Sequence, residues 1–233
     1  MNITHTMSTR SLSIAVSSSI GKVSASTIVP QKANAIITIA HGAGAGMNHP
    51  FMVSLAELLA EAGIASLRFN FPFMEKQQRR PDTPAVAYET IEAAIRKSEK
   101  LFPSLPLFAS GKSFGGRMSS QYLSEHPDSA VNGVIFFGFP LHPPGKPSID
   151  RAEHLKKIKL PMLFLQGTRD ELAKLDLIEA VCNSLRTATL VKIEGANHAF
   201  KAGKQEILPI LANTAHDWMM KQIKKTNKRV AGK

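Results

Sequence analysis

The stretch that decides the fold is Leu107–Gly116, which reads LFASGKSFGG. Its apolar start predicts a short buried strand, and the residues after Ser113 predict the first turn of a helix. A Gly-x-Ser-x-Gly pattern between a strand and a helix is a tight turn that lifts the serine hydroxyl clear of the sheet. Gly111 and Gly115 supply the small residues that this turn requires. Ser113 is therefore the candidate nucleophile.

Short apolar runs alternate with amphipathic stretches on both sides of this turn. The alternation is typical of an α/β fold, with a mostly parallel central sheet and helices on both faces. We expect strands at Ala35–Ala40, Ala65–Phe71, Leu107–Ser110, Val131–Phe137, Met162–Gln166 and Thr189–Ile193. Helical periodicity predicts helices over Pro50–Ala62, Pro84–Leu101, Phe114–Glu125, Leu172–Leu185 and Ile207–Ile223.

The N-terminal segment adds a hairpin to this sheet. Apolar and polar residues alternate over Leu12–Val16 and again from Val23, after a Gly-Lys pair. With the hairpin, the sheet has about eight strands. The chain of 233 residues suits one domain over 1–233, with frayed ends at 1–9 and 226–233.

Charge and composition exclude several classes of protein. The chain has 29 Lys and Arg against 18 Asp and Glu, a net charge of +11, and 43% hydrophobic residues. The stretch 218–233 holds six Lys and Arg and no acid, so the excess is largely a C-terminal feature and a solvated end is expected. We therefore expect no specific nucleic-acid partner, and a nonspecific anion-binding tail is the alternative.

Cysteine usage and hydropathy bear on the compartment. Cys182 is alone, so no internal disulfide can form and a reducing compartment is permitted. No apolar run approaches the roughly 18 residues of a membrane span. We expect a cytoplasmic protein with no membrane partner. The Ser-rich N-terminus is also compatible with a weak transit peptide, but its alternation favours the hairpin.

A serine nucleophile needs a general base and an acid that orients the base. Asp170 and His198 each follow one of the last two predicted strands, at the carboxyl edge of the sheet where sites in such folds form. Asp170 is preferred to Glu171 and Asp176, because Glu171 should begin the next helix and Asp176 lies within it. Of eight histidines, His198 has the right order and the right loop.

Other loop residues could complete the site. The backbone amide of Phe114 and that of Ala43, with Gly44 as second choice, are the candidate oxyanion donors. The glycine-rich loop could instead cradle a nucleotide phosphate, but it lacks both standard phosphate-binding patterns. The candidates for substrate contact are His41, His142, Arg80 and Arg117, and structural ion pairing is the alternative for the two arginines. No metal-binding spacing occurs, and we expect neither a metal nor a cofactor.

Seven sequence blocks, in order, resemble the small α/β-hydrolases related to dienelactone hydrolase. More narrowly, they are similar to the testis-expressed protein 30-like group of predicted hydrolases. The resemblance implies the α/β-hydrolase fold, with Ser113 as nucleophile, Asp170 as acid and His198 as base. Dienelactone hydrolase has Cys where this chain has Ser113, so a lactone substrate is not implied. The blocks are HGAGAGMNHPFM (41–52), RFNFPF (68–73), RRPD (79–82), GKSFGGRM (111–118), GFPLHPPGKP (138–147), LQGTRDEL (165–172) and GANHAF (195–200).

The expected function is that of a carboxylesterase-like serine hydrolase acting on small ester-type substrates. Whether the substrate carries an anionic group stays open. Only 57 positions separate Ser113 from Asp170, which leaves no room for a large cap domain. We expect an open cleft for short-acyl or aryl esters, covered by Phe139–Pro147 and the Phe71–Pro84 loop. A catalytically silent interaction module, a thioesterase and a peptidase stay open as alternatives. The oligomeric state stays open as well.

Overall fold

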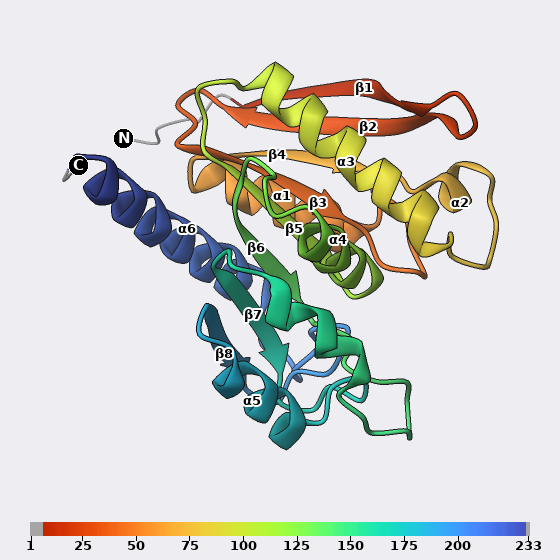
Figure 1. Cartoon of the computed structure of the whole chain (residues 1–233), viewed down its shortest axis with the longest axis vertical. Coiled ribbons are helices and arrows are strands. Elements are labelled where there is room, and N and C mark those ends of the chain that lie inside the picture. The colour runs from red at the N-terminus through yellow and green to blue at the C-terminus, as the bar shows by residue number, and fades with distance from the viewer. Residues whose placement is uncertain (1–6, 232–233) are drawn as a thin grey trace.

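A computed structural model describes the backbone of residues 7–231 and the side chains of residues 7–228. Its centre is an eight-stranded sheet in the order β1-β2-β4-β3-β5-β6-β7-β8 (Figure 1). The strands are β1 (Met7–Ser17), β2 (Gly21–Pro30), β3 (Ala35–Ala40), β4 (Ile64–Phe69), β5 (Leu107–Lys112), β6 (Val131–Phe137), β7 (Met162–Gly167) and β8 (Ala188–Ile193). Strands β3 to β8 are parallel, whereas β1 and β2 are antiparallel. The predicted mostly parallel sheet is confirmed.

Helices cover both faces of the sheet, as Figure 1 shows. They are α1 (Pro50–Glu61), α2 (Pro72–Glu75), α3 (Pro84–Leu101), α4 (Phe114–Glu125), the 3₁₀ helix η1 (Asp150–Lys157), α5 (Leu175–Ser184) and α6 (Leu208–Ala231). Helices α1 and α6 share one hydrophobic core with the sheet. Helices α3, α4 and α5, with η1, share the other.

The central strands are largely apolar because both of their sides are buried. In β3, Ile36 belongs to the core under α3 and α4, whereas Ile37 and Ile39 belong to the core under α1 and α6. Successive side chains of a strand point to opposite faces, so a strand covered on both faces is mostly apolar along its whole length. This explains why β3 reads AIITIA, in which the buried Thr38 is the one polar residue.

The N-terminal hairpin pairs as its alternation predicts. Ile14 lies opposite Val23 across the two strands, and both side chains are buried. Gly21, with a φ of +88°, begins β2 in the left-handed conformation that glycine favours. Strand β1 begins at Met7, inside the stretch 1–9 that was expected to fray, and residues 1–6 lie outside the described part of the chain.

The C-terminal helix differs from the expectation. The expected frayed stretch 226–233 is helical as far as Ala231, and 232–233 lie outside the described residues. Buried Trp218 and Met219 fix α6 on the sheet, and lysines are good helix formers that continue the helix beyond this contact. Trp218 packs within the core, in a T-shaped contact with Phe108.

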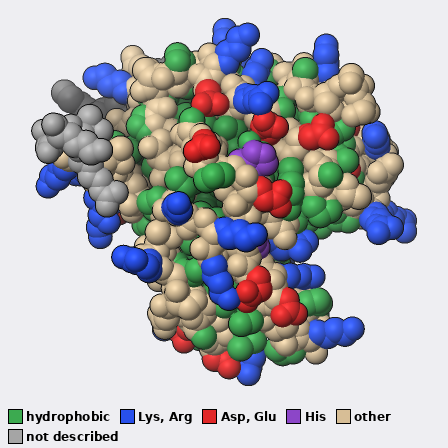
Figure 2. All heavy atoms as spheres, viewed as in Figure 1, with side chains coloured by type: hydrophobic (Ala, Val, Ile, Leu, Met, Phe, Trp, Pro, Cys, Tyr) green, Lys and Arg blue, Asp and Glu red, His purple; other side chains and the backbone are tan. Residues whose placement is uncertain are grey.

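The connections above the sheet are short. The excursion between β6 and β7 contains only η1, and the loop after β4 contains only α2, so no large cap domain covers the sheet. Neither short helix was predicted. On the face shown in Figure 2, basic and acidic side chains are interspersed. Within residues 7–231 no helix is both long enough and apolar enough to cross a bilayer.

Candidate active site

The turn between β5 and α4 has the strained backbone that the sequence predicts. Ser113 has a φ of 50° and a ψ of −114°, a conformation that residues with a side chain rarely adopt. Its amide donates to the carbonyl of Phe137 at 3.3 Å, and its carbonyl accepts from Arg117 in the first turn of α4. These two bonds hold the serine between the sheet and the helix.

Two glycines permit this turn because backbone lies where their side chains would be. A Cβ atom at Gly115 would lie 2.6 Å from the carbonyl oxygen of His41 and closer still to Ala40. A Cβ atom at Gly111 would overlap the backbone of Gly115. Helix α4 can therefore approach β3 and β5 this closely only if both positions are glycine.

Ser113, His198 and Asp170 form a continuous hydrogen-bonded chain. The Nε2 atom of His198 lies 2.8 Å from Ser113 Oγ, and its Nδ1 atom lies 2.8 Å from Asp170 Oδ2. The three residues follow β5, β7 and β8, so the carboxyl edge of the parallel sheet brings them together. With Nδ1–H donating to the carboxylate, Nε2 is free to accept the serine proton.

The carboxylate of Asp170 is buried, and further donors satisfy it. Its Oδ1 atom accepts from the backbone amide of Leu172 at 2.8 Å, and its Oδ2 atom accepts from Gln166 Nε2. The fully buried Gln166 in turn accepts from the amide of Phe139 at 2.9 Å. The bond to Leu172 belongs to the turn that precedes α5, which is why α5 begins at Leu175 rather than at the predicted Leu172.

The loop that carries His198 is held from two sides. Asn197 Oδ1 accepts from the amides of Ala199 and Lys201 at 3.1 and 3.0 Å, closing the loop on itself. The Nζ atom of Lys112 reaches across from the end of β5 and donates to the carbonyl of His198 at 2.6 Å. The imidazole is thus fixed by contacts to its own backbone as well as to Asp170.

Lys112 is a cation beside this chain of residues. Its Nζ atom lies 5.2 Å from the ring centre of Phe200 and 6.0 Å from that of Phe51. Burial lowers the pKa of Lys112 from 10.5 to about 8, while the carboxylates of Asp170 and Glu171 oppose this shift. Through its bond to the carbonyl of His198, Lys112 holds the histidine loop against the end of β5.

A cavity of about 370 Å³ opens at Ser113 and His198. Its walls come from the glycine-rich loop after β3, the start of α1 and the loops after β7 and β8. They are mostly apolar, with Phe51, Met52 and Leu172 among them. The backbones of Ala43 and Gly44 lie in the same wall as the nucleophile. A small apolar group attached to a carbonyl would fit this cavity.

The buried His41 sets the orientation of one peptide in that wall. Its Nδ1–H donates to the carbonyl of Gly42 at 2.7 Å, and its Nε2 accepts from the amide of Phe71 at 2.9 Å. In a trans peptide the next amide points opposite to the carbonyl. The N–H of Ala43 therefore points away from His41, in a loop that lies against Ser113. This geometry supports Ala43 ahead of Gly44 as an oxyanion donor.

Four residues expected to contact substrate are not part of the cavity wall. Both ring nitrogens of His41 are used by backbone, and His142 likewise bonds Pro143 and Lys174. With both rings buried, the predicted substrate contacts of His41 and His142 do not fit the structure. Arg80 is exposed. Burial, together with the nearby charge of Arg151, lowers the pKa of Arg117.

A second serine–histidine contact lies elsewhere on α4. Ser120 Oγ is 2.7 Å from His154 Nε2 and 2.9 Å from the carbonyl of Arg117. Burial, with the nearby charges of Arg117 and Lys157, lowers the pKa of His154 to about 4. Ser120 is fully buried, and no acidic side chain bonds His154 within the described residues. The pair therefore lacks the access and the third member that a nucleophile requires.

The stability of the protein should depend on the neutral form of His41. Burial lowers the pKa of His41 to about 4, against about 6.5 in an unfolded chain. The unfolded state then binds more protons between these values, so stability falls as the pH falls from about 6.5 to about 4. This group should contribute a loss of up to about 3 kcal/mol.

Urea unfolding at pH 7.0 and 5.0 of the parent and of His41→Gln measures this contribution. The variant should lose less stability on acidification than the parent does. His126→Gln, at an exposed position, is the matched control and should lose as much as the parent. An equal loss in the parent and in His41→Gln would show that the buried imidazole does not control the acid response.

No cluster of three or more metal-ligating side chains occurs among residues 7–228. Hydrogen bonds join the acid–base groups Ser113, His198 and Asp170, and Lys112 bonds the backbone of His198. His49 also lines the cavity. Such a set can activate a hydroxyl and stabilise a developing oxyanion, the two requirements of acyl transfer.

Comparisons with known proteins agree with this fold. A family model described as an alpha/beta hydrolase domain matches residues 33–228. A dienelactone hydrolase from Anabaena variabilis is 22% identical, with a TM-score of 0.76 over 93% of this chain and 98% of the other. Est1E from Butyrivibrio proteoclasticus is 19% identical, with a TM-score of 0.71 over 91% and 98%. An alpha-beta serine hydrolase homologue from Coxiella burnetii is 24% identical, with a TM-score of 0.72 over 88% and 94%.

Proposed function

Since the chain belongs to the alpha/beta hydrolase family, we propose that it is a serine hydrolase that cleaves small carboxylic esters. The observation that carries the proposal is the hydrogen-bonded chain Ser113–His198–Asp170, with both links at 2.8 Å, which opens into an apolar cavity. A purely structural serine has no need of a strained backbone, an aligned base and a satisfied buried acid at one point.

In the first half of the reaction, Ser113 Oγ attacks the ester carbonyl carbon while its proton passes to His198 Nε2. Asp170 accepts the Nδ1–H bond and stabilises the imidazolium that forms. The bond to Gln166 keeps the carboxylate in place during this step. When the tetrahedral intermediate collapses, Nε2 returns the proton to the leaving alcohol, and an acyl-serine remains.

In the second half, water gives a proton to His198 Nε2 and attacks the acyl-serine carbonyl. Collapse of the second intermediate releases the carboxylic acid and returns the proton to Ser113. The amides of Ala43 and Phe114 hold the oxyanion in both halves. One well-placed donor of this kind contributes about 3–4 kcal/mol to transition-state stabilisation.

The cavity bounds the substrate. Its volume of about 370 Å³ and its apolar lining suit a short acyl chain or one aromatic ring. An aromatic acid of this kind, ferulic acid, is bound to Est1E in one of the similar structures. No cap domain extends the cavity, so a long acyl chain would leave most of its length in water and gain little binding energy.

The acyl-chain preference tests this substrate assignment. We expect kcat/KM for p-nitrophenyl butyrate to exceed that for the palmitate by at least about tenfold, because only the short chain is buried. Met52→Ala removes a buried side chain from the cavity wall and makes room for a longer acyl chain. The variant should therefore lower the butyrate-to-palmitate ratio of kcat/KM. Leu101→Ala, at an exposed position far from the cavity, is the control. Efficient cleavage of long-chain esters alone would contradict the assignment.

A further inference from the structure

A second cavity, of about 540 Å³, lies at the opposite edge of the sheet from Ser113. Val131, Pro161 and Ala188 line it, at or next to the first residues of β6, β7 and β8. The nucleophile follows the carboxyl end of β5, and strands of six residues separate the two edges by about 20 Å. The reaction at Ser113 therefore makes no use of this cavity.

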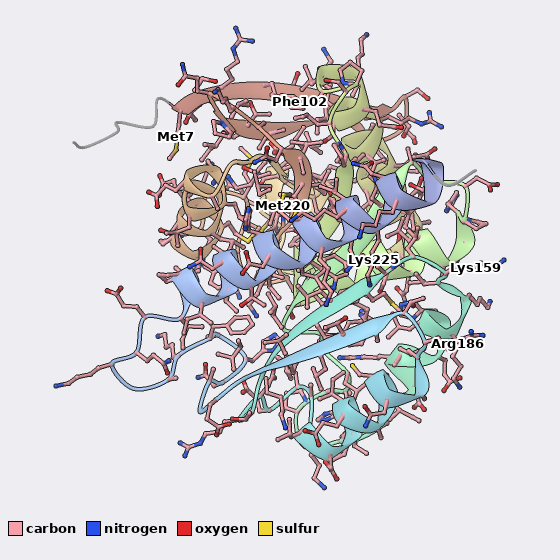
Figure 3. All side chains as sticks on the ribbon, turned by 90° about the vertical axis from the view of Figure 1, so that its left-hand side faces the viewer. Met7, Phe102, Lys159, Arg186, Met220 and Lys225 are labelled. Carbon is pink, nitrogen blue, oxygen red and sulfur yellow. The ribbon has the colours of Figure 1, made fainter. Side chains whose placement is uncertain are left out.

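Three cations from separate segments surround this cavity. Lys159 precedes β7, Arg186 precedes β8, and Lys225 lies on α6. Figure 3 shows the three labelled residues on one face of the molecule, grouped where α6 crosses the starts of these strands. No Asp or Glu lines the cavity, and none of the three cations forms an ion pair within the described residues.

An unpaired group of like charges around a hollow produces a positive potential that attracts an anion. Arg186 offers a planar fork that matches two phosphate oxygens, and the two lysines add point charges. Thr187 and Thr189 place hydroxyl groups in the same wall. These are the groups that hold a phosphate in the absence of a metal.

The cavity also has an apolar floor. The Trp218 side chain, only 7% exposed, lies there beside Leu160 and Pro161. An inorganic anion would leave this floor in water, whereas an organic phosphate would cover it and gain hydrophobic stabilisation. We propose that this cavity binds a small organic phosphate, whose phosphate contacts Lys159, Arg186 and Lys225 and whose carbon skeleton lies against Leu160, Pro161 and the exposed edge of Trp218.

The apolar floor of this cavity favours a small organic phosphate over a nucleic acid as its ligand. Proteins that bind single strands present exposed aromatic rings on which successive bases stack, along an extended positive groove. Trp218 is too buried for such stacking, and the three cations surround one cavity. A long polyanion could contact Lys225 and other lysines of α6, but it would leave the floor unused.

The test uses the intrinsic fluorescence of Trp218, the only tryptophan of the chain. The probes are AMP, glucose 6-phosphate and phenyl phosphate, with adenosine, glucose and phenol as matched neutral compounds. We expect a saturable change of fluorescence with at least one phosphate ester and none with its neutral counterpart. Inorganic phosphate should bind at least about tenfold more weakly than that ester, because it leaves the floor uncovered.

Variants locate the binding. Lys159→Gln, Arg186→Gln and Lys225→Gln, combined in one protein, should raise the Kd at least tenfold while ester hydrolysis stays at the parent level. The matched control combines Arg10→Gln, Lys22→Gln and Lys32→Gln, which removes the same charge from exposed positions elsewhere and should leave the Kd unchanged.

Three outcomes would overturn the proposal. The first is the absence of a saturable fluorescence response to any of the three phosphate esters when each is titrated to about 10 mM, beyond the millimolar Kd of a weak site. The second is an equal loss of binding in the two triple variants, which would mean that binding depends only on the net charge of the protein. The third is a response to duplex DNA alone. None of these outcomes bears on catalysis at Ser113.

Discussion

Ser113→Ala should lower kcat/KM for p-nitrophenyl butyrate by about 10⁴- to 10⁶-fold, because the variant has no group that can form the acyl-enzyme. The free energy of unfolding should change little, since within residues 7–228 the side-chain oxygen of Ser113 makes a single hydrogen bond, to His198. Steady-state kinetics and urea unfolding of the same samples separate the two effects.

Ser120→Ala is the control for this experiment. Ser120 also contacts a histidine, but it is buried away from the cavity, so its variant should keep activity within a few-fold of the parent. If instead Ser120→Ala abolished activity in a folded protein, or if Ser113→Ala kept most of it, the nucleophile would be assigned to the wrong residue.

One methyl group at Gly115 should destabilise the whole fold. The Cβ atom of Gly115→Ala would lie 2.6 Å from the carbonyl oxygen of His41, with the backbone of Ala40 closer still. Backbone of a central strand cannot move without disturbing both cores. We expect a loss of at least about 3 kcal/mol, at the upper end for an overpacked core. Because a domain of this kind has only about 5–15 kcal/mol in total, expression as inclusion bodies is an equivalent outcome.

Gly44→Ala provides the comparison for Gly115→Ala. No atom lies within 4 Å of a Cβ atom placed on Gly44, so its free energy of unfolding should stay within about 0.5 kcal/mol of the parent. Chemical denaturation of both variants measures the difference. A Gly115→Ala protein as stable as Gly44→Ala would mean that α4 does not approach β3 as closely as the structure shows.

The strands of the sheet and the helices between them were predictable because both depend on local sequence patterns. Strands β3 and β6 are largely apolar runs with the bounds that the sequence predicts, since burial on both faces favours apolar side chains. Helices α3 and α4 also have their predicted bounds. Ser113, Asp170 and His198 could be selected because each follows a strand in the expected order.

The residues that support these three could not be selected from the sequence. Gln166 reads as the polar end of a strand, and only the fold shows that it bonds Asp170 and the loop after β6. Lys112 and the carbonyl it clamps are 86 positions apart. His41 was expected at the substrate because it adjoins the glycine-rich loop, yet its ring turns into the core to bond Phe71. Such contacts depend on packing between distant segments, which no local pattern encodes.

The place of the C-terminal lysines in the fold could not be predicted from the sequence either. The lysine-rich end reads as a solvated tail, because its sequence contains no acid and few apolar residues. In the fold it continues α6 along the sheet and places Lys225 beside Lys159 and Arg186. The sequence alone could not show that a charge near the terminus and two charges in separate loops border one cavity.

Labelling by a fluorophosphonate probe, read out by intact mass and peptide mapping, tests whether Ser113 is an activated nucleophile. The probe reacts with a serine only if a base activates it and an oxyanion site receives its phosphoryl oxygen. We expect one adduct on the parent protein, located on Ser113. The adduct should be absent in Ser113→Ala and should form more slowly in Asp170→Asn. An unlabelled parent protein, or an adduct on another residue with Ser113 unmodified, would contradict this expectation and would favour a catalytically silent use of this fold.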